Sequence, residues 1–233
     1  MPSNSKVIIG IPVYNDLFTL KATIKSILES TEFPYEIVLV ESESTDRVGD
    51  YCDYLATRYA HVRVFHTKKE GPLKAYNFLF ALAQKEQKDL LLSQTDVCYP
   101  KLFMRDWLRD LHDATRQEHV SIATCLNGGG VSGPDYYDNF QWVVGWCTYI
   151  PVKTINAIGG FDEEAPNGWG VDIDYSYRAC QLGKLAFVNY WVDHHKFNAR
   201  EHEQGDQTKI QEDMAKASAY FRKKWGLGEF SKN

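Results

Sequence analysis

Asp96 is the residue of this chain whose setting most clearly suggests chemistry, because this single acid closely follows a wholly apolar run. Residues 90–92 are three leucines, and such a run is typical of a strand buried on both faces of a parallel sheet. Open α/β sheets bind ligands just beyond the carboxyl ends of their strands. A carboxylate at that place can hold a hard divalent cation and, through it, a phosphate. The alternative interpretation is a turn or helix-capping aspartate.

Other polar clusters lie beyond further apolar segments. The loop at residues 41–46 is acidic and rich in hydroxyl groups, and residues 167–174 place two glycines around Trp169 before Asp172 and Asp174. The last apolar segment, residues 185–192, is followed by an aspartate and two histidines. These clusters supply the carboxylate and imidazole groups from which binding and acid–base sites are built.

Composition narrows the class of protein. The chain has 233 residues, of which 44% are hydrophobic and 24% charged, which is typical of a soluble globular domain with one large core. A net charge of −5 argues against a nucleic-acid-binding surface. The five cysteines have no CxxC spacing, so neither a zinc site nor a disulfide framework is expected. We find neither a signal peptide nor a membrane-spanning run, which favours a cytoplasmic protein.

Apolar patterning predicts strands that alternate with helices. In the first half we predict strands at 7–11, 36–40, 62–66 and 90–93, and helices at 17–28, 46–59 and 73–84. Pro12 is expected to end the first strand, because proline cannot donate to a strand ladder. Asn15 and Asp16 are candidate caps of the first helix. This order predicts a parallel, doubly wound sheet, and the loops after Ile11, Val40 and Ser93 should meet at one edge, where a nucleotide can bind.

The second half is less regular. We predict strands at 120–125 and 185–192, helices at 101–112, 174–182 and 209–225, and a glycine-rich mobile loop at 127–134 that is equally well a plain solvent loop. The whole chain reads as one domain without a linker or repeat. The sequence has no GxGxxG after the first strand and no GxxxxGK[ST], so phosphate binding must depend on metal or on side chains.

Several stretches, in order, resemble the family-two glycosyltransferases, which have the GT-A fold. They are IPVYN at 11–15, EIVLVESESTD at 36–46 (similar to EIIVVDDGSTD), GPLKAYN at 71–77 (similar to GxxxARN), SQTDV at 93–97 (at the place of DxD), and GGFDE at 159–163 with GWGVDIDYSYR at 168–178 (similar to GGFDE and GxEDxDLxxR). The resemblance covers nearly the whole chain. It implies a single α/β domain of GT-A type, residues 1–233, with a doubly wound, mostly parallel central sheet flanked by helices. Residues 6–97 would be the nucleotide-sugar-binding half and residues 98–233 the acceptor-binding and catalytic half.

The resemblance also implies roles in donor binding. Pro12, Tyr14, Asn15 and Glu41 would lie around the base and ribose of the donor, with Glu41 in place of the family's aspartate. Asp46 and Lys74 would lie near the nucleotide, where Lys74 could meet a phosphate; the alternative for Lys74 is a solvated helix face. Trp169 would stack on an acceptor sugar or, equally, belong to the core.

For the metal, the resemblance implies that Asp96 binds Mn²⁺ or Mg²⁺. Gln94 stands where the first aspartate of DxD usually does, and its amide oxygen can still accept from a ribose hydroxyl. A histidine at the end of the last strand often meets the metal or diphosphate in this family. Strand periodicity places His194 and His195 on opposite faces, and we favour His194.

For catalysis, Asp172 matches the aspartate of the family's Glu-Asp pair, the general base that takes a proton from the acceptor hydroxyl. Val171 replaces the glutamate of that pair. Asp174 is the alternative base, although capping of the helix at Tyr175 is the interpretation we favour for it.

The sequence thus predicts a metal-assisted, inverting transferase that uses a nucleoside-diphosphate sugar, with UDP favoured. The acceptor would be a carbohydrate or lipid-linked hydroxyl, which leaves peripheral membrane attachment open. Gln94 and Val171 motivate a rival, a non-catalytic nucleotide- or sugar-binding relative. A sugar-phosphate nucleotidyltransferase is a second rival, disfavoured because no glycine-rich basic loop follows the first strand.

Overall fold

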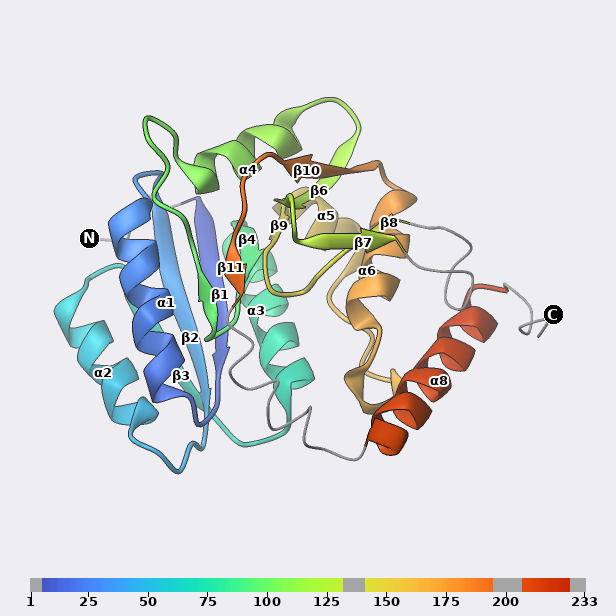
Figure 1. Cartoon of the computed structure of the whole chain (residues 1–233), viewed down its shortest axis with the longest axis horizontal. Coiled ribbons are helices and arrows are strands. Elements are labelled where there is room, and N and C mark those ends of the chain that lie inside the picture. The colour runs from blue at the N-terminus through green and yellow to red at the C-terminus, as the bar shows by residue number, and fades with distance from the viewer. Residues whose placement is uncertain (1–5, 132–140, 195–206, 227–233) are drawn as a thin grey trace.

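The computed structural model describes residues 6–131, 141–194 and 207–226, and it is built around one large sheet (Figure 1). This sheet has seven strands in the order β10-β6-β9-β4-β1-β2-β3. The pairs β1–β2, β1–β4, β2–β3 and β6–β10 are parallel, whereas β9 is antiparallel to both of its neighbours. The predicted α/β fold with a mostly parallel central sheet flanked by helices is therefore confirmed.

The elements follow one another in mostly alternating order. The strands of the large sheet are β1 (Val7–Val13), β2 (Tyr35–Ser42), β3 (Val62–Thr67), β4 (Asp89–Leu92), β6 (Val120–Cys125), β9 (Thr148–Ile150) and β10 (Lys184–Val188). The helices are α1 (Leu17–Ser30), α2 (Val48–Arg58), α3 (Pro72–Glu86), α4 (Trp107–Arg116), α5 (Val152–Ile158), α6 (Val171–Cys180) and α8 (Gln207–Lys224), with a 3₁₀ turn η1 at Pro166–Gly168. Two small sheets pair β5 (Val97–Cys98) with β11 (Asp193–His194), and β7 (Gly129–Val131) with β8 (Gln141–Val143).

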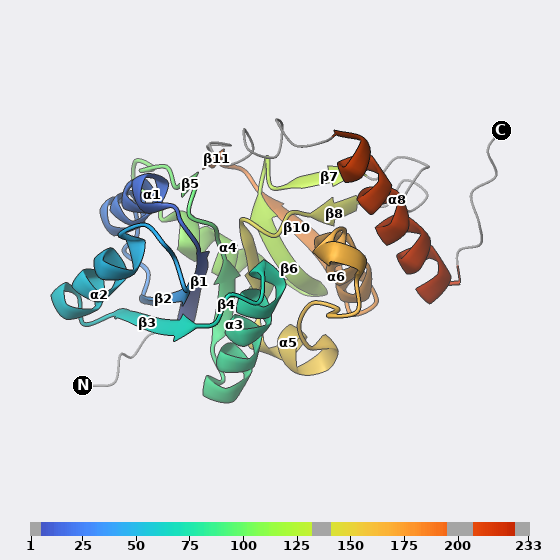
Figure 2. The same ribbon diagram turned by 90° about the horizontal axis from the view of Figure 1, so that it is seen from below.

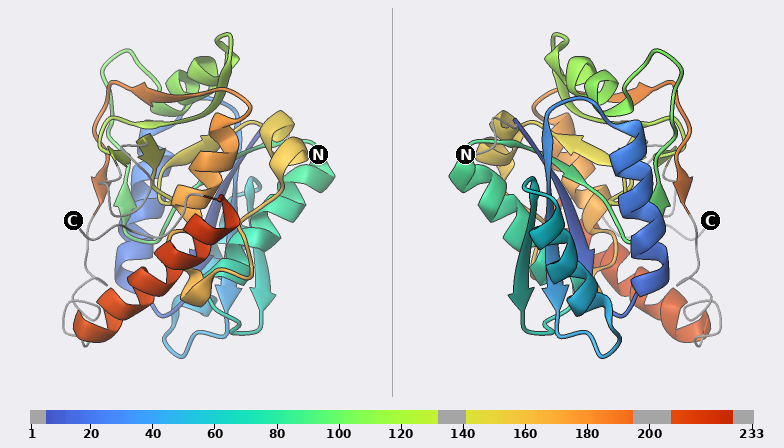
Figure 3. Two further views of the ribbon diagram at one scale, coloured as in Figure 1. Left: turned by 90° about the vertical axis from the view of Figure 1, so that its right-hand side faces the viewer. Right: turned by 90° about the vertical axis from the view of Figure 1, so that its left-hand side faces the viewer.

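The sheet is buried on both faces, which explains the apolar runs in the sequence. Side chains from α1, α2 and α4 pack on one face, and those from α3, α5 and α6 pack on the other. Figure 3 (right) shows α1 and α3 on opposite sides of the strands. Helix α3 lies directly on β1, because a Cβ at Gly10 would come within 2.8 Å of Leu79 Cδ1. Burial of each large apolar side chain contributes roughly 1.5–3 kcal/mol to this core.

Two predicted boundaries in the first half and at α4 are wrong, each for a local reason. Strand β1 continues through Pro12 to Val13, beyond the end of the β1–β4 ladder at Gly10, so β4 requires no donor from the proline. Helix α4 begins at Trp107 rather than near residue 101, because Asp106 caps it. The Oδ1 atom of Asp106 accepts from the backbone N–H groups of the second and third helical residues, at 2.9 and 3.0 Å.

Three predictions in the second half also need correction. The glycine-rich segment includes β7, which pairs with β8, so residues 129–131 are not a plain loop; residues 132–134 lie outside the described residues. The predicted last strand ends at Val188, after which a turn leads to β11, which leaves the large sheet and pairs with β5. Helix α6 begins at Val171, not at residue 174, so Asp174 does not cap it.

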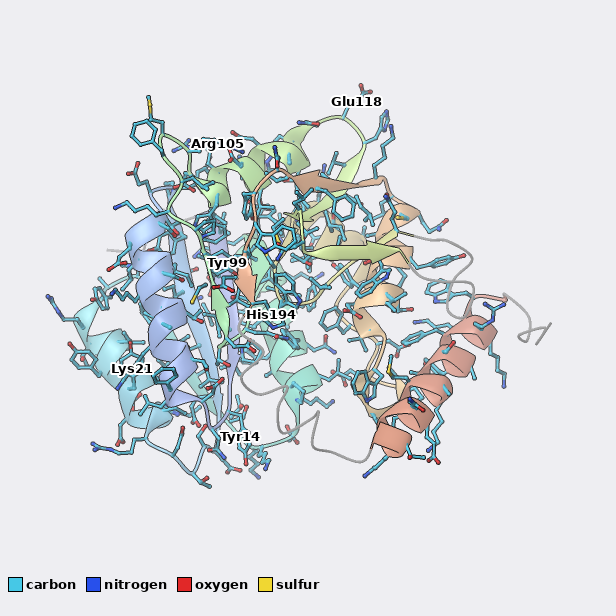
Figure 4. The ribbon with its side chains drawn as sticks, in the orientation of Figure 1. Tyr14, Lys21, Tyr99, Arg105, Glu118 and His194 are labelled. Atoms are coloured by element: carbon cyan, nitrogen blue, oxygen red, sulfur yellow. The ribbon has the colours of Figure 1, made fainter. Side chains whose placement is uncertain are left out.

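Because β1, β2 and β4 are parallel, the candidate site residues that follow these strands lie at the same edge of the sheet. Figure 4 shows Tyr14 at the end of β1, near the edge of the molecule, and His194 nearer its centre.

Helix α8 lies at the opposite end of the molecule from α2, next to η1 and α6 (Figure 2). Within the described ranges, 6–131, 141–194 and 207–226, no helix is both long and apolar enough to span a membrane.

Candidate active site

The loop after β4 is fixed by its middle residue, Thr95. The hydroxyl of Thr95 donates to Asp16 Oδ2 at 2.6 Å, and its carbonyl accepts from Thr23 Oγ1 at 2.6 Å. Asp16 directly precedes α1 and Thr23 lies in the middle of that helix, and all three residues are buried. Because Thr95 is buried and makes two hydrogen bonds, moving it would leave polar groups unpaired. The flanking residues Gln94 and Asp96 are therefore held in place.

Asp96 and His194 are brought together by the small β5–β11 sheet. The antiparallel register pairs His194 with Val97, and His194 Nε2 lies 3.5 Å from Asp96 Oδ1. The imidazole stacks on Trp146, with ring centroids 4.6 Å apart and planes at 27°. The sequence did not single out Trp146 as a residue of this site. His194, the histidine that we favoured, thus lies beside Asp96, and its role as a metal ligand stays a prediction; His195 lies outside the described residues.

This pair fits part of a divalent-cation site. Asp96 offers a carboxylate and His194 an imidazole, and Mg²⁺ or Mn²⁺ in phosphate-transfer sites is commonly held by one or two protein groups together with the phosphates of the substrate. No group of three or more potential metal ligands occurs in the part of the chain that the structure describes. A cation here would therefore depend on oxygen ligands from a bound diphosphate.

Gln94 contacts a residue that the sequence did not single out, Tyr76 of α3. Gln94 Nε2 lies 2.9 Å from the Tyr76 hydroxyl, and the tyrosine side chain is buried. Burial raises the pKa of Tyr76, and the charges of Asp96 and Asp172 raise it further. The Tyr76 ring also packs edge-on against Phe161, which lines the pocket of Asp172, so Tyr76 lies between Gln94 and that pocket.

Asp172 lies in the first turn of α6, at a narrow pocket with mostly apolar walls. Seven residues share this lining with it: Leu92, Val143, Gly145, Thr148, Ile150, Phe161 and Tyr175. Its Oδ1 accepts from the backbone N–H of Ile173 at 2.9 Å. Burial raises the pKa of Asp172 to about 6, although hydrogen bonds from the backbone groups of Ile173 and Gly145 act in the opposite direction. A carboxylate with a pKa near neutral is suited to proton transfer.

Asp174 has a structural environment instead. Its side chain is fully buried and accepts from Arg178 Nε at 2.9 Å, Lys224 Nζ at 3.0 Å and Trp225 Nε1 at 3.1 Å. The predicted N-cap role is wrong because Gly170, with a φ of +70°, stands at that position. The aspartate ties α8 to α6, and its oxygens are already occupied by these donors.

The loops after β1 and β2 are tied to each other by Asn15 and Asp46. Asn15 Oδ1 accepts from the backbone N–H groups of Thr45 at 2.6 Å and Asp46 at 3.3 Å. Asp46 accepts from Leu17 N at 3.2 Å and Val48 N at 3.0 Å, at the starts of α1 and α2. The predicted helix cap at Asn15 is therefore wrong, since its side chain holds the neighbouring loop.

Glu41 is buried at the end of β2 and has two internal partners. Oε1 accepts from Ser44 N at 2.6 Å, and Oε2 lies 2.9 Å from Nδ1 of His66, whose Nε2 lies 2.9 Å from Asp53. Burial by itself raises the pKa of Glu41, but the hydrogen bonds from His66 and Ser44 outweigh it and the pKa is lowered. The hydrogen bonds to Glu41 and Asp53 raise the pKa of His66. No local sequence pattern indicates this triad, because His66 is 25 positions from Glu41 and 13 from Asp53.

The remaining predicted donor-site residues lie at the same end of the first strands and at α3. Tyr14 is 40% exposed, and Lys69 Nζ donates to its hydroxyl at 2.5 Å. Pro12 is half-buried opposite Val40. Lys74 is exposed but is not a freely solvated cation, because it forms an ion pair with Glu163 of the GGFDE segment.

Trp169 is half-buried next to the start of α6. Its position, directly before Gly170 and three residues from Asp172, follows from the sequence, and its role as a sugar platform stays a prediction.

Comparisons with known proteins identify the family of this chain. Residues 8–133 match the model of the family described as glycosyl transferase family 2. An uncharacterized glycosyltransferase of Escherichia coli, YibD, is 31% identical over 125 residues, which is 54% of this chain and 35% of that protein. Glycosyltransferase GlyG of Streptococcus pneumoniae is 35% identical over 77 residues, which is 33% of this chain and 26% of that protein. The aligned region thus spans at most about a third of these curated relatives.

Solved structures share the fold at low sequence identity. A mannosyltransferase from Pyrobaculum calidifontis in complex with GDP-Man and Mn²⁺ superposes with a TM-score of 0.60 and 19% identity, over 81% of this chain and 58% of that one. GalNAc-T7 with UDP, GalNAc and Mn²⁺ gives a TM-score of 0.64 and 18% identity, over 82% of this chain and 44% of that one. The fold is therefore shared with glycosyltransferases, and the family match covers more than half of the 233 residues. On this basis, the chain belongs to glycosyl transferase family 2.

Proposed function

We propose that this chain is a metal-assisted, inverting glycosyltransferase that moves a sugar from a nucleoside-diphosphate sugar to an acceptor hydroxyl. The observation that carries the proposal is the placement of Asp96 and Asp172 on either side of one side chain, Tyr76, which contacts Gln94 two residues before Asp96 and packs against Phe161 in the pocket of Asp172. Asp96 would act on the leaving diphosphate through a bound cation, and Asp172 would act on the attacking hydroxyl. Residues 6–97 would bind the donor, while residues 98–233 would supply Asp172 and the acceptor contacts.

Asp172 would act as the general base. Its raised pKa, about 6, keeps it mostly ionised at neutral pH and makes it a stronger base than an ordinary aspartate. It would remove the proton from the acceptor hydroxyl, whose oxygen forms the new bond to the anomeric carbon. The bond between that carbon and the diphosphate oxygen breaks, and its electron pair leaves with the nucleoside diphosphate. Attack from the face opposite the leaving group inverts the configuration at the anomeric carbon.

Asp96 and His194 would hold Mn²⁺ or Mg²⁺. When bound, such a cation neutralises negative charge on the leaving diphosphate. The described part of the chain offers only these two side chains at that place, so metal binding should depend strongly on the nucleotide. The two structural relatives above were solved with Mn²⁺ and a nucleotide or nucleotide sugar, which supports a donor of this chemical class.

The donor base is proposed as uracil, on the resemblance of residues 11–15 and 36–46 to the family's donor loops. Pro12, Tyr14, Asn15, Glu41 and Asp46 gather at the ends of β1 and β2, and Lys74 lies at the start of α3. The acceptor is proposed as a hydroxyl of a carbohydrate or of a lipid-linked sugar. Trp169 is positioned near Asp172 along the chain and is the proposed acceptor platform.

Thermal unfolding with added nucleotides tests the donor site. UDP, GDP, CDP and TDP are compared with and without Mn²⁺, because a ligand that binds the folded state raises its apparent stability. We expect UDP to raise the melting temperature chiefly when Mn²⁺ is present, and Asp96→Asn to remove the metal-dependent part. The exposed Asp50, replaced by Asn, is the matched control. UDP binding that does not depend on Mn²⁺ would contradict the metal role of Asp96.

Sugar transfer to an acceptor panel tests the base. Asp172→Asn should keep the UDP and Mn²⁺ response and lose transfer by about 10²- to 10⁴-fold, the usual contribution of a general base. Near-normal transfer by this variant would refute the assignment of Asp172. Nucleotide binding without turnover by the unmodified chain would favour the non-catalytic relative, and release of pyrophosphate from a nucleoside triphosphate would favour the nucleotidyltransferase.

A further inference from the structure

Two positions where this chain departs from the family motifs are in direct contact. Tyr76 occupies the arginine position of the GxxxARN segment, and Gln94 occupies the position of the first aspartate of DxD. Their side chains meet across 2.9 Å, from Gln94 Nε2 to the Tyr76 hydroxyl, although they lie 18 positions apart in the chain. Two unusual residues that bind each other are best understood as one joint exchange.

The charges of the exchange balance. An arginine and an aspartate together carry no net charge, and neither do a tyrosine and a glutamine. An aspartate at position 94 alone would add a negative charge near Asp96 and Asp172, which is costly at a partly buried position, whereas an arginine at position 76 would supply a countercharge. Tyr76 is only 9% exposed, and its ring packs edge-on against Phe161 at 5.5 Å between centroids, so the pair lies where this cost applies.

The pair also affects the proposed base. Burial and the charges of Asp96 and Asp172 raise the pKa of Tyr76, so its hydroxyl stays neutral. A guanidinium at the same place would stabilise the ionised form of nearby carboxylates and lower their pKa. The neutral tyrosine therefore allows burial to keep the pKa of Asp172 near 6.

We propose that Tyr76 is a positioning residue for the donor, which fixes the amide of Gln94 so that a neutral Tyr76–Gln94 pair contacts the nucleotide sugar. Gln94 is half-buried, and in the described part of the chain its Oε1 receives no protein donor, so this atom is open to a ligand hydroxyl. An amide oxygen accepts a hydrogen bond as a carboxylate does but adds no charge to a metal site. This inference rests on the proposed transferase function and deepens it.

Four variants test the pair: Tyr76→Phe, Tyr76→Arg, Gln94→Asp and the double variant Tyr76→Arg/Gln94→Asp. The exposed Tyr54, replaced by Phe, is the matched control. Tyr76→Phe removes one hydroxyl and should raise the KM for the donor about 3- to 10-fold, the loss of one hydrogen bond, with kcat within about twofold. Tyr76→Arg should move the acidic limb of the activity profile to lower pH, which a merely structural role would not do.

Unfolding measurements test the coupling of Tyr76 and Gln94 independently of the proposed function. Gln94→Asp should lower the melting temperature, and Tyr76→Arg should recover most of this loss in the double variant, because the two effects are coupled. Losses in the double variant that equal the sum of the single losses would overturn the joint exchange, whatever the activity. An unchanged donor KM in Tyr76→Phe would overturn the positioning role. A chain that binds no nucleotide refutes the proposed function and the donor role together, while the unfolding data still decide whether the two residues are coupled.

Discussion

Replacing Asp172 by asparagine should stabilise the folded protein while it removes the proposed base. Burial raises the pKa of Asp172 from the ordinary 3.8 to about 6 in the folded state. A carboxyl group whose pKa is raised by folding binds its proton more tightly in the folded chain than in the unfolded one. Its favourable contribution is complete below the unfolded pKa, where both states are protonated, and is lost as the pH rises through about 6. Above that pH, the ionised side chain destabilises the fold.

The size of this effect follows from the two pKa values. The full difference corresponds to about 3 kcal/mol at neutral pH. Because the side chain of Asp172 is half-buried and not sealed from water, we expect between about 1 and 3 kcal/mol. For a chain of this length, that raises the melting temperature by roughly 3–10 °C. Asparagine retains an oxygen that can accept from Ile173 N, so the substitution changes mainly the charge.

Urea unfolding of both proteins at pH 5 and pH 8 provides the measurement. The stability gained by Asp172→Asn should be larger at pH 8, where the wild-type carboxylate is ionised, and smaller at pH 5. Asp50→Asn, at an exposed position, should change stability by less than about 0.5 kcal/mol at both values. An equal gain at the two pH values, or a loss at both, would refute the reasoning that burial of charge controls this residue.

Other substitutions test how the site is held and when it works. Transfer activity should fall on the acidic side with a midpoint near pH 6, as Asp172 becomes protonated; a profile flat down to pH 5 would exclude it as the base. Lys224→Met leaves the fully buried Asp174 with one cation fewer and should cost about 2–4 kcal/mol in urea unfolding, whereas Lys223→Met, at an exposed position, should have little effect. Thr95→Val removes a buried hydrogen bond and should cost about 1–3 kcal/mol and weaken the Mn²⁺ response to UDP; unchanged stability and an unchanged response would show that this anchor does not hold the loop.

Much of the fold could be predicted because each element obeys one strong local rule. The leucines at 90–92 have to be buried on both faces, and the alternation of strands with helices leaves few arrangements other than a parallel sheet. The errors occur where tertiary contacts override the local rule. Pro12 continues β1 because the ladder with β4 has already ended, and the N-cap Asp106 makes α4 begin at Trp107, later than the expected residue 101.

The candidate site was predictable to the extent that a residue lies at the end of a strand or in a recognisable motif. Asp96 and Asp172 could be found in this way. Partners that come from distant segments could not, because nothing in the local sequence near Gln94 indicates Tyr76, and nothing near Glu41 indicates His66. Side chains of this kind become visible only when the fold brings their segments together.

Helix α3 connects the two proposed halves of this chain. Its first turns carry Lys74, Tyr76 and Asn77, and all three reach across to other segments. Asn77 both accepts from the backbone N–H of Phe161, at 2.8 Å, and donates to its carbonyl, at 3.0 Å. Phe161 in turn lines the pocket of Asp172. The helix that contacts Gln94, on the proposed donor side, therefore also fixes a wall of the pocket of the proposed base, so a substitution that displaces α3 should disturb both places.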